Sequence, residues 1–236
     1  MPRPPRIEVA GGVHHVTAKA PFGRVLFIDD QDRVRYLGLL AREVARRRWR
    51  VLTYCQMTNH LHLLIRTPEP DHGTGIKSIH ERYATDLNTR HRQYVHVFGA
   101  RFKNKLVRTD RHLHGCLRYI ARNPVEAGMC AAPIEWPWGA HGALVGLVEP
   151  SGGVDVEGAL SCLGSNLGSA RIAYQQLVAP TTSALLGEWE HADPDTWLAI
   201  AVDDFNVDIA AVAERLGVHQ VTAWRRLAAA RKRRAS

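Results

Sequence analysis

The segment from residue 51 to residue 66 constrains the fold more than any other part of the chain. It holds two short runs rich in apolar and β-branched residues, 51–57 and 60–66, with only Thr58-Asn59 between them. Two strands joined by so short a connection pair as an antiparallel hairpin. We therefore expect an antiparallel sheet that contains this hairpin.

Further strands and helices are predicted before and after the hairpin, from apolar periodicity of two or of 3.6 residues. In chain order, we expect strands at residues 13–18, 51–57, 60–66 and 101–108, and helices at residues 29–50, 75–91 and 111–122, the last stopped by Asn123-Pro124. The order β-α-β-β-α-β-α predicts an α+β fold with an antiparallel sheet and its helices on one face.

The C-terminal part predicts a separate all-α region. Residues 208–216 and 220–231 repeat apolar side chains at helical spacing, a short turn with Gly217 joins them, and the second helix is basic. This is the pattern of a helix-turn-helix, whose second helix enters the DNA major groove; an ordinary helical hairpin is the alternative. The DNA contacts predicted on this helix are Gln220, Thr222, Arg225 and Arg226.

Three regions follow from these patterns: a first domain at residues 1–146, a helical connecting region at 147–202 and the helix-turn-helix at 203–236.

The chain of 236 residues has 45% hydrophobic residues, enough for a core, and a formal net charge of +8. That charge favours a polyanionic partner such as nucleic acid, although a basic soluble protein would show it too.

Composition also bears on the compartment. None of the four cysteines stands at metal-ligand spacing from another, which is typical of the reducing cytosol. The N-terminus has no apolar stretch of a secretory signal, and no apolar run approaches the roughly 20 residues of a membrane span. We expect a cytoplasmic protein without a membrane partner.

Two histidines stand at alternate positions of the strand at residues 60–66. Side chains two apart on a strand point to the same face, so His60 and His62 would stand side by side, about 6.6 Å apart along the backbone. Leu61 and Leu63 would point into the core instead. Two neutral imidazoles side by side form half of a divalent-metal site, whereas the alternative is a pair of packing histidines.

A tyrosine and an amide share one face of the helix at residues 111–122 and its end. Tyr119 and Asn123 are four residues apart, and Asn123 can offer an amide oxygen to a metal ion. The Tyr119 phenol can attack phosphorus, because the phosphotyrosine ester conserves bond energy and can be reversed. Arg118, Arg122 or the metal would help it to ionise; the alternative is a tyrosine that packs its ring in the core.

The strand at residues 101–108 carries a row of cations. Arg101, Lys103, Lys105 and Arg108 could follow a phosphate backbone. The aromatic residues expected to stack on bases are Phe98, Phe102 or Tyr83. A solvated strand face explains the same pattern.

The order and phrasing of these motifs decide between the alternatives. The relevant stretches are Val13-His14-His15-Val16-Thr17, Phe27-Ile28-Asp29-Asp30-Gln31-Asp32-Arg33, Tyr54-Cys55-Gln56-Met57-Thr58-Asn59-His60-Leu61-His62-Leu63-Leu64, Gly99-Ala100-Arg101-Phe102-Lys103 and Arg118-Tyr119-Ile120-Ala121-Arg122-Asn123-Pro124-Val125-Glu126-Ala127-Gly128. Together they resemble the REP-associated tyrosine transposases, which belong to the single-tyrosine HUH nuclease superfamily. The resemblance spans about residues 5 to 146.

The resemblance implies a ferredoxin-like sheet, Mg²⁺ or Mn²⁺ held by His60, His62 and Asn123, and Tyr119 as the nucleophile. It implies an enzyme that cleaves and rejoins single-stranded DNA at hairpins of palindromic repeats through a 5′-phosphotyrosine. It also implies a bacterial protein associated with the nucleoid, which could bind double-stranded DNA through the helix-turn-helix. The sequence leaves open whether the protein is a monomer or a homodimer.

Departures from the family pattern keep an alternative function in view. Relatives often have histidine where this chain has Ala121, and an Arg-Gly-Asn run where it has Lys19-Ala20-Pro21. A DNA-binding regulator that uses the same fold without cleavage is therefore the alternative. A phosphoesterase with two His-x-Thr motifs is disfavoured, because His60-Leu61-His62 lacks the threonine.

Overall fold

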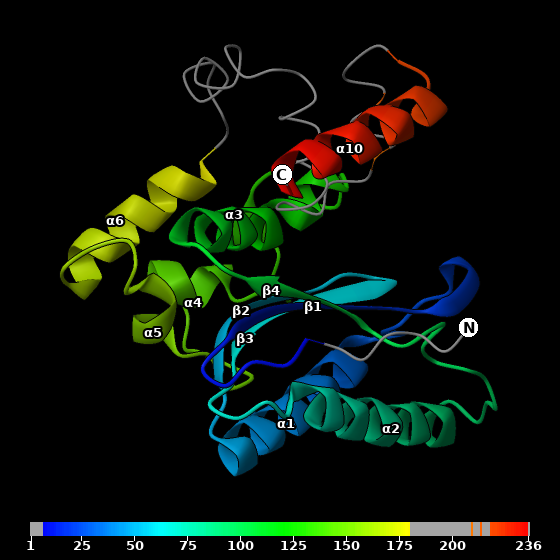
Figure 1. The fold of residues 1–236 in the computed structure, drawn as a ribbon. Coiled ribbons are helices and arrows are strands. Elements are labelled where there is room, and N and C mark those ends of the chain that lie inside the picture. The colour runs from blue at the N-terminus through cyan, green and yellow to red at the C-terminus, as the bar shows by residue number, and fades with distance from the viewer. Residues whose placement is uncertain (1–6, 180–208, 210–212, 214–217, 236) are drawn as a thin grey trace. The chain divides into compact units, whose positions relative to one another are not determined.

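The computed structural model describes residues 7–179, 209, 213 and 218–235 (Figure 1). The chain divides into two compact units, one of residues 1–113 with 117–178 and one of residues 114–116 with 179–236. In the described residues, no helix combines the length and the apolar character that crossing a membrane requires.

A four-stranded sheet forms the centre of the first unit. Its strands are β1 (Val13–Lys19), β2 (Arg50–Gln56), β3 (His60–Arg66) and β4 (Lys103–Val107), in the order β2-β3-β1-β4. Every neighbouring pair is antiparallel, which confirms the hairpin expected at residues 51–66. The connection is one residue longer than predicted, because Met57 already lies outside β2 and its N–H donates to the His60 carbonyl at 2.9 Å.

Two long helices cover one face of the sheet (Figure 1). They are α1 (Asp30–Arg47) and α2 (His72–Arg90). α1 begins at Asp29, whose side chain accepts from the backbone N–H of Asp32 in a capping box. The ring of His72 in α2 stacks on His14 of β1 at 4.1 Å between centroids, so the even-numbered residues of β1 face these helices.

A third helix, α3 (Asp110–Glu126), packs on the opposite face. The ring of Tyr119 lies 5.2 Å from that of His62, whose side chain points away from α1 and α2. The prediction of helices on one face alone is therefore wrong. The reason is that five consecutive residues of β3 are buried, and a strand buried on both faces needs cover on both.

α3 also continues through Asn123-Pro124, where the sequence predicted its end. Pro124 lacks only its own N–H, and the last turn closes with Ala127 N–H donating to Asn123 O at 3.0 Å and Met129 N–H to Pro124 O at 2.9 Å. Gly128, at φ 67°, then ends the turn in the left-handed conformation. Asn123 consequently lies inside the helix, one turn beyond Tyr119.

The edge of β2 that does not pair with β3 is covered by later parts of the chain. Gln56 N–H donates to Trp138 O at 2.8 Å, Ala140 N–H to Tyr54 O at 3.0 Å and Asp155 N–H to Val51 O at 2.8 Å. The remaining helices of this unit are α4 (His141–Val145), α5 (Val156–Leu160), α6 (Leu167–Val178) and the 3-10 turns η1 (Pro21–Gly23) and η2 (Pro133–Glu135). A covered edge cannot recruit a foreign strand.

The second unit contributes α10 (Gln220–Ala235), which begins where the second helix of the helix-turn-helix was predicted. Gln220, Thr222 and Arg225 are exposed on it, and Arg226 is half-buried. The predicted first helix, residues 208–216, lies outside the described residues except for Ile209 and Ala213, both helical and buried. The helix-turn-helix and the domain boundaries after residues 146 and 202 therefore stay predictions.

The packing of α2 on Trp49 makes a testable prediction about Gly75. A Cβ at Gly75 would lie 2.2 Å from Cη2 of Trp49, a ring that is 3% exposed and whose Nε1 donates to Asp71 at 2.8 Å. We expect Gly75→Ala to lower the free energy of unfolding by about 1–3 kcal/mol in urea denaturation. This loss would appear even though alanine is the better helix former by about 1 kcal/mol.

Gly38 in α1 provides the matched control. It is exposed, and a Cβ there would meet no atom within 4 Å. Gly38→Ala should therefore raise the free energy of unfolding by about 0.4–1 kcal/mol. A Gly75→Ala protein as stable as the Gly38→Ala protein would contradict the packing described here.

Candidate functional site

The two histidines of β3 stand on the face that α3 covers. His60 and His62 lie on the same side of the strand, as predicted, with ring centroids 5.0 Å apart and planes at 90°. Leu61 and Leu63 point the other way, into the core with α1 and α2. His60 is half-buried at the start of the strand, and His62 is 2% exposed.

α3 brings Tyr119 and Asn123 to the same pair of histidines. The Tyr119 ring meets His62 edge to face at 5.2 Å and is itself half-buried. The Asn123 side chain hydrogen-bonds His60, which raises the His60 pKa against the larger, lowering effect of burial. The four residues of two separate sequence motifs thus lie together: His60, His62, Tyr119 and Asn123.

A third histidine lies behind the pair and was not among the predicted site residues. His15 Nε2 lies 3.1 Å from His62 Nδ1, and Thr17 Oγ1 lies 3.3 Å from the same nitrogen. Both come from β1, where residues 15 and 17 share the face of His62 because Thr17 is its direct partner in the ladder. The sequence motif His15-Val16-Thr17 was the available signal, but only the pairing of β1 with β3 gives it this meaning.

Burial keeps these imidazoles neutral. It lowers the pKa of His60, lowers that of His62 well below 6.5 and, helped by the charge of Lys105, lowers that of His15 to about 3. Neutral imidazole is the form that binds metal ions. Lys19 also lowers the pKa of His60 through its charge.

One ring nitrogen of each histidine is a candidate ligand for a divalent metal ion. His62 Nε2 is buried without a hydrogen-bond partner in the described residues. His60 Nδ1 lies 2.7 Å from Asn59 Oδ1, which can only accept, so the proton sits on Nδ1 and the lone pair on Nε2. With the amide oxygen of Asn123, the donor set is nitrogen and oxygen, suited to several divalent ions.

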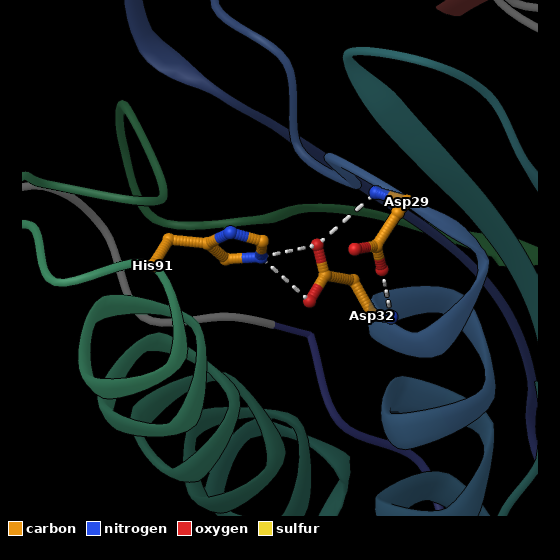
Figure 2. A group of neighbouring side chains, drawn as sticks. All are labelled: Asp29, Asp32 and His91. Carbon is orange, nitrogen blue, oxygen red and sulfur yellow. Dashed lines mark hydrogen bonds and ion pairs between the residues drawn. The ribbon is translucent and has the colours of Figure 1, made fainter.

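A second group of possible ligands lies between α1 and α2, and the sequence analysis missed it. Ligand atoms of Asp29, Asp32 and His91 lie within 4.8 Å of one another, and Figure 2 shows His91 Nε2 directed at the Asp32 carboxylate, 3.0 Å from Oδ2. Arg90 donates to Asp29 at 2.7 Å and to Asp32 at 2.6 Å. That hydrogen bond with Arg90 is the main reason that the pKa of Asp29 falls to about 2.

This group is an electrostatic brace between the helices. Both aspartates form the capping box at the N-terminus of α1, and Arg90 stands in the last turn of α2, so the carboxylates and the guanidinium suit their helix dipoles. The Arg90 guanidinium already neutralises the charge of the two carboxylates to which a metal ion would have to bind.

The predicted basic residues fall into two groups. On and beside β4, Arg101, Lys103 and Arg108 are exposed and Lys105 is half-buried; Lys103 pairs with Thr17 and Lys105 with His15. Both lysines therefore share the face of His62. Arg118 and Arg122 instead donate to the carbonyls of Leu177 and Val178, at the C-terminal end of α6.

Two of the three aromatic residues expected to stack on bases, Tyr83 and Phe102, are buried in the protein, and Phe98 is half-buried. Tyr83 is 1% exposed and donates its hydroxyl to Leu26 O at 2.7 Å, Phe102 is buried, and Phe98 stacks on His80 at 3.9 Å. Tyr83 and Phe102 are therefore too well buried to stack on a base, whereas Phe98 is half-buried and stays a prediction.

An aromatic residue that the sequence analysis missed is exposed on the loop that follows β1. Phe22 in η1 is 99% exposed and adopts the left-handed conformation at φ 52°. Its loop is fixed where Ala20 N–H donates to Asn59 O at 2.9 Å and Leu26 N–H to Thr58 O at 2.8 Å. The loop therefore lies beside the residues that lead into His60.

No protein-family model matches this sequence, and no curated protein sequence matches it. A solved structure described as a REP-associated tyrosine transposase bound to a REP hairpin is similar to it, with a TM-score of 0.55 and 18% identity. The similarity covers 66% of this chain and 93% of that one. At this identity the likeness shows that the two chains share a fold, α+β with a four-stranded antiparallel sheet.

The two candidate metal sites make opposite predictions for Mn²⁺ binding. If His62 is a metal ligand, His62→Ala should weaken Mn²⁺ binding at least about tenfold in isothermal titration calorimetry. Asp32→Asn should leave that affinity unchanged while it lowers the free energy of unfolding by about 1–3 kcal/mol, because it weakens the brace. Loss of Mn²⁺ binding in Asp32→Asn with full binding in His62→Ala would reverse the assignment.

Proposed function

We propose that this protein is a metal-dependent single-strand DNA transposase or endonuclease of the REP-associated tyrosine transposase type, with a ferredoxin-like sheet. It would cleave and rejoin DNA at hairpins of palindromic repeats. The observation that carries the proposal is the contact of Tyr119 with His62, beside His60 and Asn123. A phenol beside neutral imidazoles with a free nitrogen suits the nucleophile of a metal-dependent phosphoryl transfer.

The reaction follows from the chemistry of these groups. Tyr119 Oη gives up its proton as it attacks the scissile phosphorus and forms a 5′-phosphotyrosine ester, while the bond from phosphorus to the 3′ oxygen breaks. The leaving 3′ oxygen takes up a proton and becomes a 3′-OH. Attack by the 3′-OH of another strand reverses the step, so the rejoining needs no external energy source.

The residues of the chain divide this work. Tyr119 stands on a helix and packs edge to face on His62, which restricts the direction of attack. His60, His62 and Asn123 would hold Mg²⁺ or Mn²⁺, which when bound polarises the scissile phosphate and offsets its charge. His60 and His62 stay neutral, because burial lowers the pKa of each.

The proposed substrate is single-stranded DNA beside a hairpin. The solved structure of similar fold is described as bound to a REP hairpin, and exposed cations lie around the site. Arg101, Lys103, Lys105 and Arg108 would contact phosphates, and Phe22 would stack on a base. Gln220, Thr222, Arg225 and Arg226 on α10 would contact double-stranded DNA if this segment is a helix-turn-helix.

One prediction of the proposed function concerns covalent chemistry. With a labelled hairpin oligonucleotide and Mn²⁺, the wild-type protein should form an adduct that survives a denaturing gel. Tyr119→Phe should form none and lose at least about 1000-fold in cleavage rate, because it lacks the attacking oxygen. Its affinity for the oligonucleotide should stay the same.

Tyr94→Phe is the control, because Tyr94 is fully exposed and loses the same oxygen. It should cleave as the wild type does. Undiminished cleavage by Tyr119→Phe would remove Tyr119 from the mechanism. Hairpin binding without any adduct in the wild-type protein would favour the regulator that does not cleave.

Another prediction of the proposed function concerns the stacking of Phe22 on a base. Stacking of an aromatic ring on one base contributes about 1–3 kcal/mol, so Phe22→Ala should weaken binding of the single-stranded hairpin flank about 5- to 150-fold. Fluorescence anisotropy without metal ion measures this affinity free of cleavage. Val34→Ala is the control, since Val34 is 61% exposed on α1, across the sheet; equal affinities of the two variants would argue against stacking.

A further inference from the structure

We propose that His15, assisted by Thr17, fixes the tautomer of His62 and so directs the His62 Nε2 lone pair into the metal site. His15 is thus a positioning residue, not a ligand. The proposal rests on the proposed function in one respect, that His62 binds the metal ion. It concerns two residues of β1 that lie outside the predicted set of ligands and nucleophile.

The contact is built into the sheet. Thr17 is the ladder partner of His62, and His15 is the partner of Leu64, so the three polar side chains share one face. His15 Nε2 and Thr17 Oγ1 lie 3.1 Å and 3.3 Å from His62 Nδ1. His15 is 3% exposed and its ring lies at a tilt to that of His62, with centroids 5.2 Å apart.

The surroundings of the two His62 nitrogens differ, and the difference selects a tautomer. A proton on Nδ1 has two acceptors in reach, the ring nitrogen of His15 and the hydroxyl of Thr17. A proton on Nε2 would point into a buried space where the described residues offer no hydrogen-bond partner. A buried donor without an acceptor is costly, so the Nδ1–H form is favoured.

This arrangement requires that His15 accept through Nε2 and carry its own proton on Nδ1. A neutral imidazole has one nitrogen that donates and one that accepts, so His15 can fill both roles at once. An outer partner of this kind orients a metal-binding histidine and raises its basicity.

Nitrogen NMR of the metal-free, full-length protein tests the tautomer directly. Long-range proton–nitrogen correlation should show His62 as the Nδ1–H form in the wild type. In His15→Leu the Nε2–H form should appear, and the dissociation constant for Mn²⁺ in calorimetry should rise about 10- to 100-fold. His15→Gln, whose carbonyl can accept from Nδ1, should recover most of the affinity.

His14→Leu is the matched control. His14 is also buried on β1, but it faces α2 and stacks on His72, across the sheet from His62. It should leave the His62 tautomer and the Mn²⁺ affinity unchanged, even where stability falls. If His15→Leu fails to fold, Thr17→Val, at a half-buried position, should still show a smaller shift toward the Nε2–H form.

The outcomes separate the two proposals. A wild-type His62 in the Nε2–H form, or an unchanged tautomer and Mn²⁺ affinity in His15→Leu, would overturn the positioning role of His15. A wild-type protein that binds no Mn²⁺ would overturn the proposed metal site and, with it, the purpose assigned to His15. Adduct formation that depends on Tyr119, together with an unchanged His62 tautomer and Mn²⁺ affinity in His15→Leu, would leave the proposed function intact and refute only the inference.

Discussion

The pairing of β1 with β3 is the interaction on which the candidate site depends. Thr17 opposite His62 sets the register, and the register decides which residues share a face. A slip by one residue would turn His15 and Thr17 toward α1 and α2 and bring Val16 and His14 under the site. The burial of Val16, Leu61 and Leu63 on the core face prevents this, because a slip would exchange their positions with those of polar side chains.

The position of α3 is fixed by contacts on both of its sides. Toward the sheet, Tyr119 packs on His62 and on His15, with centroids 5.2 Å and 6.1 Å apart. On another side, Arg118 and Arg122 donate to the last carbonyls of α6. Guanidinium groups satisfy carbonyls that a helix end leaves without partners, and their charge suits its dipole. Arg118 and Arg122, which lie close to Tyr119 in the sequence, thus hold the helix that carries it.

Local patterns predicted the parts of this arrangement that depend on one element at a time. The period of two placed His60 and His62 on one face, and the spacing of four placed Tyr119 and Asn123 on another. What depends on pairing between distant elements was not predictable. His15 acquires its role only through the β1–β3 register, and Phe22 only through a left-handed turn at a residue other than glycine. The run of buried residues in β3 already contained the signal for cover on both faces.

The two edges of the sheet differ in a way that bears on where a polyanion can approach. The backbone of residues 138–140 and 155 closes the β2 edge, and among the described strands β4 pairs only with β1. β4 is also the least buried strand, and its Lys103 is exposed. Lysines on an edge strand discourage pairing with another strand, yet they attract phosphate. Lys103 and Lys105 share the face of His62. The two lysines that protect this edge therefore also place positive charge on the side of the sheet that carries the candidate site.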